Sequence, residues 1–305
     1  MQNFSYHTHT VFSDGHNTIE EMLDRAEELG WREIGISDHL IVHKNITRSR
    51  SFPRWMNSPN NHVYRTGFVA AAEDFARHAE NVRRAARGRR LKVKVGAEVD
   101  WFVYDGWEEE FAAFRKESGL DYYISGNHFL QPSEGEILDI KDLSLLAGPE
   151  REKALKNHFA AICRAIESGV FAFIAHVDYI RKSEFCPDEA FWQEKMKVVD
   201  CLEKCKTATE LSSKGLRKRG DFYPADKLIR EIVRRQIPLV VSDDAHRTGE
   251  LGFEFAKAEE YLRELGCRRR WQLLTFCRQT GSRNRLPADT AGCQRQCPSN
   301  GRTGV

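Results

Sequence analysis

Histidine and acidic residues recur in this 305-residue chain directly after short runs of strand-forming residues. Imidazole and carboxylate groups together are ligands that Zn, Mn and Fe accept, whereas Ca and Mg favour shells made only of oxygen. Six imidazoles and three carboxylates are too many for one ion, so the pattern predicts a centre of two or three divalent transition-metal ions. The nine candidate ligands are His7, His9, Asp14, His39, Glu98, His128, His176, Asp244 and His246.

Each candidate ligand has an alternative, because a lone histidine at a strand end is more often a hydrogen-bonded structural residue. The pair His7 and His9 is weak evidence by itself, since side chains two apart on any strand point to one side. The complete set is stronger evidence, because chance would scatter such residues over both ends of the strands. Burying so many titratable groups without a cation would be costly. Glu98 is the natural bridge between two ions, since one carboxylate can supply an oxygen to each.

Strand-like runs alternate with helical patterns along the chain, which predicts βαβ units and a parallel sheet. The predicted strands are 4–9, 33–38, 92–99, 122–127, 171–177, 207–211 and 238–242. The predicted helices are 18–29, 67–87, 107–118, 150–168, 188–204, 224–235 and 251–265. Seven units without a GxGxxG phosphate loop favour an α/β fold of the closed or nearly closed barrel type over a Rossmann sheet. The carboxyl ends of the strands would then share one face, where the nine ligands would meet.

The composition is that of a globular protein with a sizeable core, with 41% apolar and 30% charged residues. The 47 basic and 45 acidic residues leave a formal net charge of +2, which gives no reason to expect a nucleic-acid or membrane partner. No run approaches the roughly 18 apolar residues of a membrane span, and the N-terminus lacks the pattern of a signal peptide. We therefore expect a cytoplasmic protein with reduced cysteines, and the sequence leaves the oligomeric state open.

Two segments interrupt the alternation of strands and helices. Residues 40–65 form a long, basic insertion after the second predicted strand, and a loop of that length is typical of a lid or substrate loop, the alternative being disorder. The side chains of this insertion include Arg48, Arg50, Arg54, Trp55 and Tyr64. Residues 281–305 are rich in Gly, Arg, Gln and Pro without apolar periodicity, so we expect a disordered tail after a catalytic domain that spans 1–270.

The candidate ligands lie in an ordered set of motifs, namely HTHTVFSDG (7–15), SDH (37–39), GAE (96–98), His128, His176 and DAH (244–246). This set, which spans about four-fifths of the chain, resembles the polymerase and histidinol phosphatase (PHP) superfamily. The runs DYYISGNH (121–128), AHVDYIRK (175–182) and ELSSKGLRK (210–218) are similar to those of its monofunctional histidinol-phosphatases. The resemblance implies a distorted (β/α)7 barrel, similar to a TIM barrel, with a trinuclear metal centre at the carboxyl ends of its parallel strands.

The resemblance also implies how the ligands divide among the ions. One ion would be held by His7, His9, Glu98 and Asp244, a second by Glu98, His128 and His176, and a third by Asp14, His39 and His246. The chain departs from the family pattern at three positions. Asp243 stands where a small residue is usual, His16 could compete with Asp14, and Asn127 precedes His128. The Asp-x-His spacing selects Asp244 over Asp243.

A metal centre of this kind lowers the pKa of bound water and presents hydroxide at neutral pH. We therefore expect hydrolysis of a phosphomonoester by attack of a metal-bridging hydroxide on phosphorus, with no covalent phosphoenzyme. The predicted catalytic residues are Asp244, Glu98 and Asp178. Asp178 or Asp100 would orient an imidazole or protonate the leaving alkoxide, and the alternative for both is a supporting or surface position.

Contacts to the substrate are predicted from charged residues near the ligands. A phosphate dianion suits the geometry of arginine, and Arg217 is the first choice for this contact, with Arg181 second. Lys214 lies in the same basic run as Arg217, and the alternative for that run is a solvated basic surface. Glu210, which precedes the run, is placed to meet the amine of a cationic substrate.

The function that the resemblance implies is hydrolysis of L-histidinol phosphate to L-histidinol and phosphate in histidine biosynthesis, with a small-molecule phosphomonoester as the binding partner. A second hypothesis keeps this chemistry and changes the substrate to another phosphomonoester or a nucleotide. A third hypothesis is a regulatory or scaffold protein with an inactive metal site. Against the third, all nine ligand positions are filled.

Overall fold

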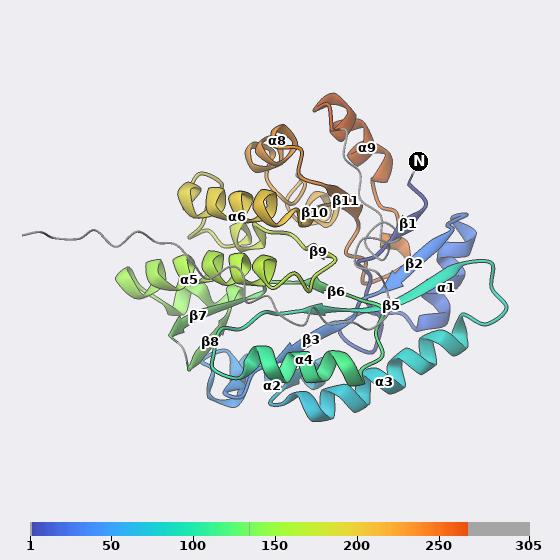
Figure 1. Ribbon diagram of the computed structural model, residues 1–305, viewed down its shortest axis with the longest axis horizontal. Helices are drawn as coiled ribbons and strands as arrows, with labels where there is room; N and C mark the ends of the chain where they lie inside the picture. The colour runs from blue at the N-terminus through green and yellow to red at the C-terminus, as the bar shows by residue number, and fades with distance from the viewer. Residues whose placement is uncertain (1, 134, 268–305) are drawn as a thin grey trace, which may run out of the picture. The chain divides into compact units, whose positions relative to one another are not determined.

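The computed structural model describes residues 2–133 and 135–267, and its central strands run parallel to one another (Figure 1). In this part of the chain, seven strands follow one another in the order β1-β2-β5-β6-β9-β10-β11, and each overlaps a predicted strand. Their bounds are β1 (Phe4–Ser5), β2 (Glu33–Ile36), β5 (Lys92–Val99), β6 (Tyr122–Ser125), β9 (Phe173–Ile174), β10 (Ala208–Ser212) and β11 (Leu239–Ser242). The prediction of a parallel sheet built from seven βα units is confirmed.

The first and last strands of this order meet just beyond their carboxyl ends. Thr8 and Ala245 pair in parallel. The His9 N–H donates to the Ala245 carbonyl at 2.8 Å, and the Ala245 N–H donates to the His7 carbonyl at 3.3 Å. The sheet is therefore the nearly closed α/β barrel that the sequence predicted. Because the closure is made by segments that carry candidate ligands, it also brings His7 and His9 next to Asp244.

A helix follows most of the barrel strands, as predicted (Figure 1). The helices that match predicted ones are α1 (Ile19–Glu28), α3 (Phe68–Ala85), α4 (Trp107–Glu117), α5 (Gly148–Glu167), α6 (Trp192–Cys205), α8 (Asp226–Arg234) and α9 (Phe255–Glu264). The capping box at the start of α1 is present, because Thr18 Oγ1 accepts from the Glu21 N–H and the Glu21 carboxylate accepts from the Thr18 N–H. These two bonds satisfy backbone donors that the helix itself cannot pair.

One tyrosine fills the barrel interior and accounts for two glycines of the strands. Tyr122 on β6 reaches across its neighbours and donates to the Tyr6 carbonyl at 2.8 Å. A Cβ atom at Gly96 on β5 would lie 2.6 Å from the Tyr122 ring, and one at Gly35 on β2 would lie 2.2 Å from its hydroxyl. Any larger residue at either position would displace the ring. The position of the Tyr122 ring inside the barrel therefore depends on glycine at both positions.

The insertion 40–65 is folded and docks on a hairpin that the sequence analysis did not predict. It contains β3 (His39–Val42), η1 (Ile46–Arg48), α2 (Phe52–Met56), η2 (Asn61–Val63) and β4 (Tyr64–Arg65), and the hairpin is formed by β7 (Phe129–Ser133) and β8 (Glu136–Asp139), with η3 (Ile140–Leu145) after it. Arg50 pairs with Glu136 and Glu150. Arg54 pairs with Asp139 at 2.7 Å and with Asp142 at 2.8 Å. Both guanidinium groups are therefore neutralised within the protein, and a role of this segment as a basic lid stays a prediction.

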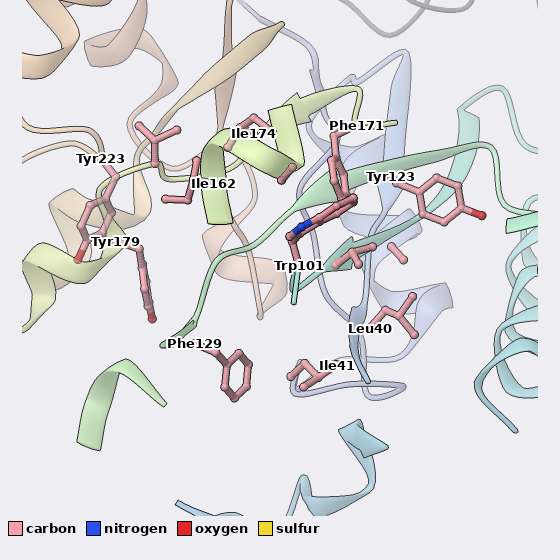
Figure 2. Close-up of a cluster of buried hydrophobic side chains, with 14 of the residues drawn as sticks. Leu40, Ile41, Trp101, Tyr123, Phe129, Ile162, Phe171, Ile174, Tyr179 and Tyr223 are labelled. Atoms are coloured by element: carbon pink, nitrogen blue, oxygen red, sulfur yellow. The ribbon is translucent and has the colours of Figure 1, made fainter. Parts of the chain in front are cut away.

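Aromatic side chains pack around the carboxyl end of β5 and support the residues that follow it. Figure 2 shows Trp101 beside Phe171, with their ring centroids 5.8 Å apart. Trp101 also packs on Trp107 at the start of α4, at 4.6 Å. This aromatic core supports the end of β5, the strand that carries Glu98.

No helix within the described ranges is long and apolar enough to cross a membrane. The predicted tail 281–305 lies outside those ranges.

Candidate metal centre

Glu98 lies at the centre of the predicted ligand set. It is completely buried at the end of β5. Its two carboxylate oxygens lie between 3.0 and 3.6 Å from the imidazole nitrogens of five histidines, namely His7, His9, His39, His128 and His176. The pairing of β3 with β5 contributes directly, because it sets His39 opposite Glu98. Gly126 makes room for the carboxylate, since a Cβ atom there would lie 2.8 Å from Glu98 Oε1.

The remaining predicted ligands extend this cluster on one side. Asp244 Oδ1 lies 3.3 Å from His9 Nε2 and 3.5 Å from His246 Nδ1. Asp14 Oδ1 lies 3.2 Å from His246 Nε2 and 3.4 Å from His39 Nε2. All nine predicted side chains therefore belong to one cluster at the carboxyl ends of the strands.

The cluster contains four overlapping groups, and within each group the donor atoms lie within 4.8 Å of one another. They are His9, Asp14, His39 and His246; His7, His9 and Glu98; His7, His176 and Asp244; and His39, Glu98 and His128. The first group contains the whole set that the resemblance implies for a third ion. The other groups combine the expected ligands differently, so the division of ligands among ions stays a prediction.

The donor atoms at the centre of the cluster fit metal ions because they lie close together without forming hydrogen bonds. Buried atoms without a hydrogen-bond partner among the described residues include His7 Nε2, both ring nitrogens of His9, His39 Nδ1, Glu98 Oε2 and Asp244 Oδ1. A buried polar atom left unpaired costs about 1–3 kcal/mol. Divalent cations would pair these atoms, and the mixture of imidazole and carboxylate suits first-row transition metals.

The charges of the cluster also conflict in the absence of cations. Burial acts to lower the pKa of His7, but Asp244, Glu98 and Glu210 outweigh it and raise this pKa well above its ordinary value. Burial, together with the imidazoles of His246 and His39, lowers the pKa of His9 to about 3. The pKa values of two neighbouring rings in the cluster are thus shifted in opposite directions. Metal ligation would remove the conflict, because it requires neutral imidazoles and ionised carboxylates.

Two buried carboxylates outside the ligand set hold ligand rings in place. Asp100 accepts from the His128 N–H at 2.5 Å and contacts His128 Nδ1 at 3.1 Å, which is the orienting position that the sequence analysis considered. Glu210, expected near a substrate amine, lies instead inside the barrel on β10. It contacts His7 Nδ1 at 2.9 Å and accepts from the His176 N–H at 2.8 Å and the Ser242 hydroxyl at 2.6 Å. Both of its oxygens are therefore already engaged.

Replacing Glu210 with glutamine is expected to weaken metal binding about 10- to 100-fold, because the carboxylate that fixes the His7 ring would be lost. The measurement is a competition titration of Zn against a chelator of known affinity. Glu203→Gln on the exposed face of α6 is the matched control, since Glu203 pairs with Arg235 and touches no ligand. An unchanged Zn affinity in Glu210→Gln would show that the His7 ring is oriented without this contact.

Asp38 is a further buried carboxylate, and the sequence analysis did not single it out. It accepts from the Thr10 N–H at 2.7 Å and from the Ser13 hydroxyl at 2.6 Å, and it lies 3.0 Å from His78 Nε2 on α3. These contacts fix the loop that carries Asp14. The signal was present in the SDH motif at 37–39, but it was interpreted for the histidine alone.

The structure distinguishes the residues that departed from the family pattern. Asp243 turns away from the cluster and accepts from the Ser5 hydroxyl at 2.8 Å and the Gly252 N–H at 2.7 Å. Asp244 has a φ of 47°, a backbone conformation that directs its carboxylate to the imidazoles instead. His16 is exposed and lies 3.3 Å from Arg247, outside the four groups. Asn127 adopts a φ of 64°, which asparagine tolerates better than most residues.

Two of the predicted substrate-binding residues lie against the cluster. Lys214 Nζ is 2.7 Å from Asp244 Oδ2. Arg217 Nη2 donates to the Asp243 carbonyl at 2.9 Å and the Asp244 carbonyl at 3.2 Å. The Nε and Nη1 atoms of Arg217 are buried and have no hydrogen-bond partner among the described residues, and Nη2 also lies 3.4 Å from Glu250 Oε2. The phosphate contact of Arg217 stays a prediction. Both side chains belong to the segment of α7 (Lys214–Lys218).

Arg181 and Asp178 occupy a buried network of their own. Arg181 is 1% exposed, pairs with Asp221, and lies 3.2 Å from Asp188. Asp178 accepts from the Ala225 N–H at 2.8 Å, and burial raises its pKa. Neither residue belongs to the four groups of candidate ligands. The phosphate contact of Arg181 and the catalytic role of Asp178 stay predictions.

Comparison with known proteins agrees with this geometry. The family model described as PHP domain matches residues 5–214, which is most of the barrel. The chain belongs to the PHP domain family. A curated relative named "Probable histidinol-phosphatase", from Deinococcus radiodurans, is 28% identical over 272 residues that cover 86% of this chain and 93% of the relative.

Two solved structures share the fold of this PHP domain protein. One, from Listeria monocytogenes and named "putative histidinol phosphatase", has a TM-score of 0.65 at 19% identity, covering 83% of this chain and 99% of that chain. The other, a histidinol phosphate phosphatase from Lactococcus lactis in complex with Zn, L-histidinol and phosphate, has a TM-score of 0.60 at 15% identity, covering 87% and 94%. The predicted family and fold are therefore confirmed.

Proposed function

We propose that this protein is a metal-dependent phosphomonoesterase that hydrolyses L-histidinol phosphate to L-histidinol and phosphate, a reaction of histidine biosynthesis. The observation that carries the proposal is the convergence of nine imidazole and carboxylate side chains, with Glu98 at their centre, at the carboxyl ends of the barrel strands. The name of the Deinococcus relative supports the substrate, and the similar Lactococcus structure binds L-histidinol, phosphate and Zn together.

Two or three divalent ions of Zn, Mn or Fe are the proposed cofactors, held by the nine side chains of the cluster. When bound, such ions supply a nucleophilic hydroxide at neutral pH and neutralise charge on the phosphoryl oxygens. Glu98 and Asp244 would serve as carboxylate ligands, while Glu210 and Asp100 hold the rings of His7 and His128. Lys214 and Arg217 place two positive charges beside Asp244, where they would attract a phosphate dianion.

One observation favours a different phosphomonoester as the alternative substrate. Glu210, the residue expected to bind the amine of histidinol phosphate, is completely buried and has protein partners on both oxygens. Meanwhile Lys214 and Arg217 supply positive charge near the cluster. Binding of a phosphate by these two residues would serve equally for an ester without an amine.

The deciding experiment measures phosphate release from L-histidinol phosphate beside an aryl phosphate and several sugar and nucleotide monophosphates, with Mn or Zn added. We expect histidinol phosphate to be preferred in kcat/KM by roughly two orders of magnitude or more, as for a site that hydrogen-bonds its substrate. Equal values for histidinol phosphate and the aryl phosphate would leave a phosphomonoesterase with another substrate. No hydrolysis of any ester by metal-loaded protein would leave the scaffold hypothesis.

Replacing Arg217 with alanine is expected to lower kcat/KM about 10- to 100-fold, because a hydrogen bond between charged groups contributes about 1.5–3 kcal/mol. Steady-state kinetics on the preferred ester measures the effect. Arg234→Ala on the exposed side of α8 is the control for loss of one positive charge. If Arg217→Ala stays within about threefold of the parent enzyme, Arg217 does not contact the transferred phosphate.

A further inference from the structure

Asp14 differs from the other predicted metal ligands because a loop carries it beyond the closure of the barrel. Its side chain is 33% exposed, whereas the side chains of the other eight are at most 16% exposed. The loop is tied down after Asp14, where the His16 N–H donates to the His246 carbonyl at 2.8 Å. The segment 10–14 is not part of a strand, so the position of the Asp14 carboxylate depends on what this loop contacts.

The carboxylate of Asp38 receives the polar groups of this loop. It accepts from the Thr10 N–H at 2.7 Å, from the Thr10 hydroxyl at 2.8 Å and from the Ser13 hydroxyl at 2.6 Å. The Phe12 N–H donates to Thr10 Oγ1 at 3.2 Å, which extends the same network along the loop. Asp38 is completely buried, so its charge needs partners that the protein itself supplies.

His78 on α3 contacts both the carboxylate of Asp38 and the tip of the loop. It is 2% exposed, and its Nε2 atom lies 3.0 Å from Asp38 Oδ2. Its ring stacks on that of Phe12, with the centroids 3.9 Å apart and an interplanar angle of 8°. One imidazole therefore faces a carboxylate with its edge and an aromatic ring with its face. Phenylalanine could supply only the stacking, and glutamine only the polar group.

Phe12 is also where α3 and the insertion 40–65 meet the loop. Its ring centroid lies 5.0 Å from that of Phe75 on α3, in an edge-on arrangement. The guanidinium carbon of Arg65, at the end of the insertion, lies 5.9 Å from the Phe12 centroid. The Phe12 carbonyl lies 3.2 Å from His62 Nε2 in η2. Elements outside the barrel sheet thus surround a residue two positions before Asp14.

We propose that His78 is a positioning residue, which holds the loop of Asp14 so that this carboxylate can bind a metal ion. The inference rests on the metal cofactors of the proposed function and deepens that proposal, because it assigns the affinity for one ion to a helix outside the barrel sheet. The ion concerned is the one that a single group of donors would hold, namely His9, Asp14, His39 and His246. The affinity for the other ions should not depend on His78.

The first test replaces His78 with phenylalanine, which keeps a ring against Phe12 and removes the polar contact with Asp38. In a competition titration of Zn against a chelator of known affinity, one equivalent of Zn is expected to bind about 10-fold or more weakly than in the parent protein. The remaining Zn should bind as before. His78→Gln, which keeps a polar group but no ring, should recover part of the affinity.

Tyr123→Phe is the matched control, because it also removes a buried polar contact between a barrel strand and a helix. The Tyr123 hydroxyl on β6 lies 2.8 Å from the Ser118 hydroxyl at the end of α4, and no predicted ligand takes part in this bond. Zn affinity should change by less than about twofold. Equal losses of Zn affinity in His78→Phe and Tyr123→Phe would mean that any loosening of the barrel weakens the metal centre, and would overturn the proposal.

The second test combines His78→Phe with Asp14→Asn. In the Asp14→Asn protein, His78→Phe should change the affinity for the remaining Zn by less than about twofold, because its effect passes through Asp14. Additive losses would show that His78 acts by another route, and parent-like Zn binding by His78→Phe would show that it positions nothing. Either result overturns the proposal.

The titration of the parent protein separates this inference from the proposed function. A parent protein that binds no Zn would overturn the proposed cofactors and the role of His78 together. A parent protein that binds Zn but hydrolyses no phosphomonoester would overturn the proposed function and leave the expected affinities of the His78 variants unchanged.

Discussion

Replacing Glu98 with glutamine is expected to lower kcat for phosphomonoester hydrolysis by about three orders of magnitude or more, because several kcal/mol of transition-state stabilisation depend on the metal centre. Glu98 is the residue whose two oxygens face five imidazoles, and it is completely buried. Glutamine has nearly the same shape but no negative charge, and its amide nitrogen cannot ligate a cation. The substitution therefore removes one ligand that several ions would share.

The measurement is kcat on the preferred ester together with the metal content of the purified variant by mass spectrometry. Glu33→Gln is the matched control, because Glu33 is also a buried glutamate of a barrel strand but begins β2 at the opposite end from the cluster. It should retain both activity and metal. If Glu98→Gln kept a kcat within about tenfold of the parent enzyme with full metal content, the cluster would not be the catalytic centre.

The strand ends of the barrel could be predicted because two independent patterns coincide there. The alternation of strand and helix fixes which ends share a face, and the ligand types fall at those ends, so His39, Glu98 and His176 were identified without knowledge of any contact. The capping box at Thr18 and the helices between strands are equally local signals, and they match the structure closely.

The hairpin β7–β8 was missed for a local reason. Its first strand, Phe129–Ser133, contains Pro132, and a proline inside a run argues against a strand. Missing the hairpin also affected the interpretation of the insertion 40–65, because the carboxylates that pair with Arg50 and Arg54 lie on and after this hairpin. Without those carboxylates in view, the sequence showed the arginines of the insertion but not the residues that pair with them.

Roles that depend on contacts between distant residues could not be derived from spacing. Glu210 and His7 are 203 positions apart, and the carboxylate was assigned to a substrate amine because only its place before a basic run was visible. A glutamate in the middle of a completely buried strand is nevertheless a signal, since such a charge requires an internal partner.

Removal of bound metal by a chelator is expected to abolish hydrolysis and to destabilise the fold as well. Ions that bind the native state at about 1,000 times their Kd contribute about 4 kcal/mol to the free energy of unfolding. For a domain of this size, that loss corresponds to a fall in Tm on the order of 10 °C. The physical reason is that chelation leaves buried atoms such as His9 Nε2, His39 Nδ1 and Glu98 Oε2 without partners.

Scanning calorimetry of metal-loaded and chelator-treated protein measures the shift, and kinetics after addition of Zn, Mn or Fe identifies the ions that restore activity. Glu98→Gln provides the internal control, because a variant that binds less metal has less stability to lose and should show a smaller chelator shift than the parent enzyme. Glu33→Gln should show the full shift. A parent enzyme that retained its Tm and activity with less than about a tenth of an equivalent of metal would contradict the linkage between binding and stability. The buried imidazoles and carboxylates would then have to be balanced by protons alone.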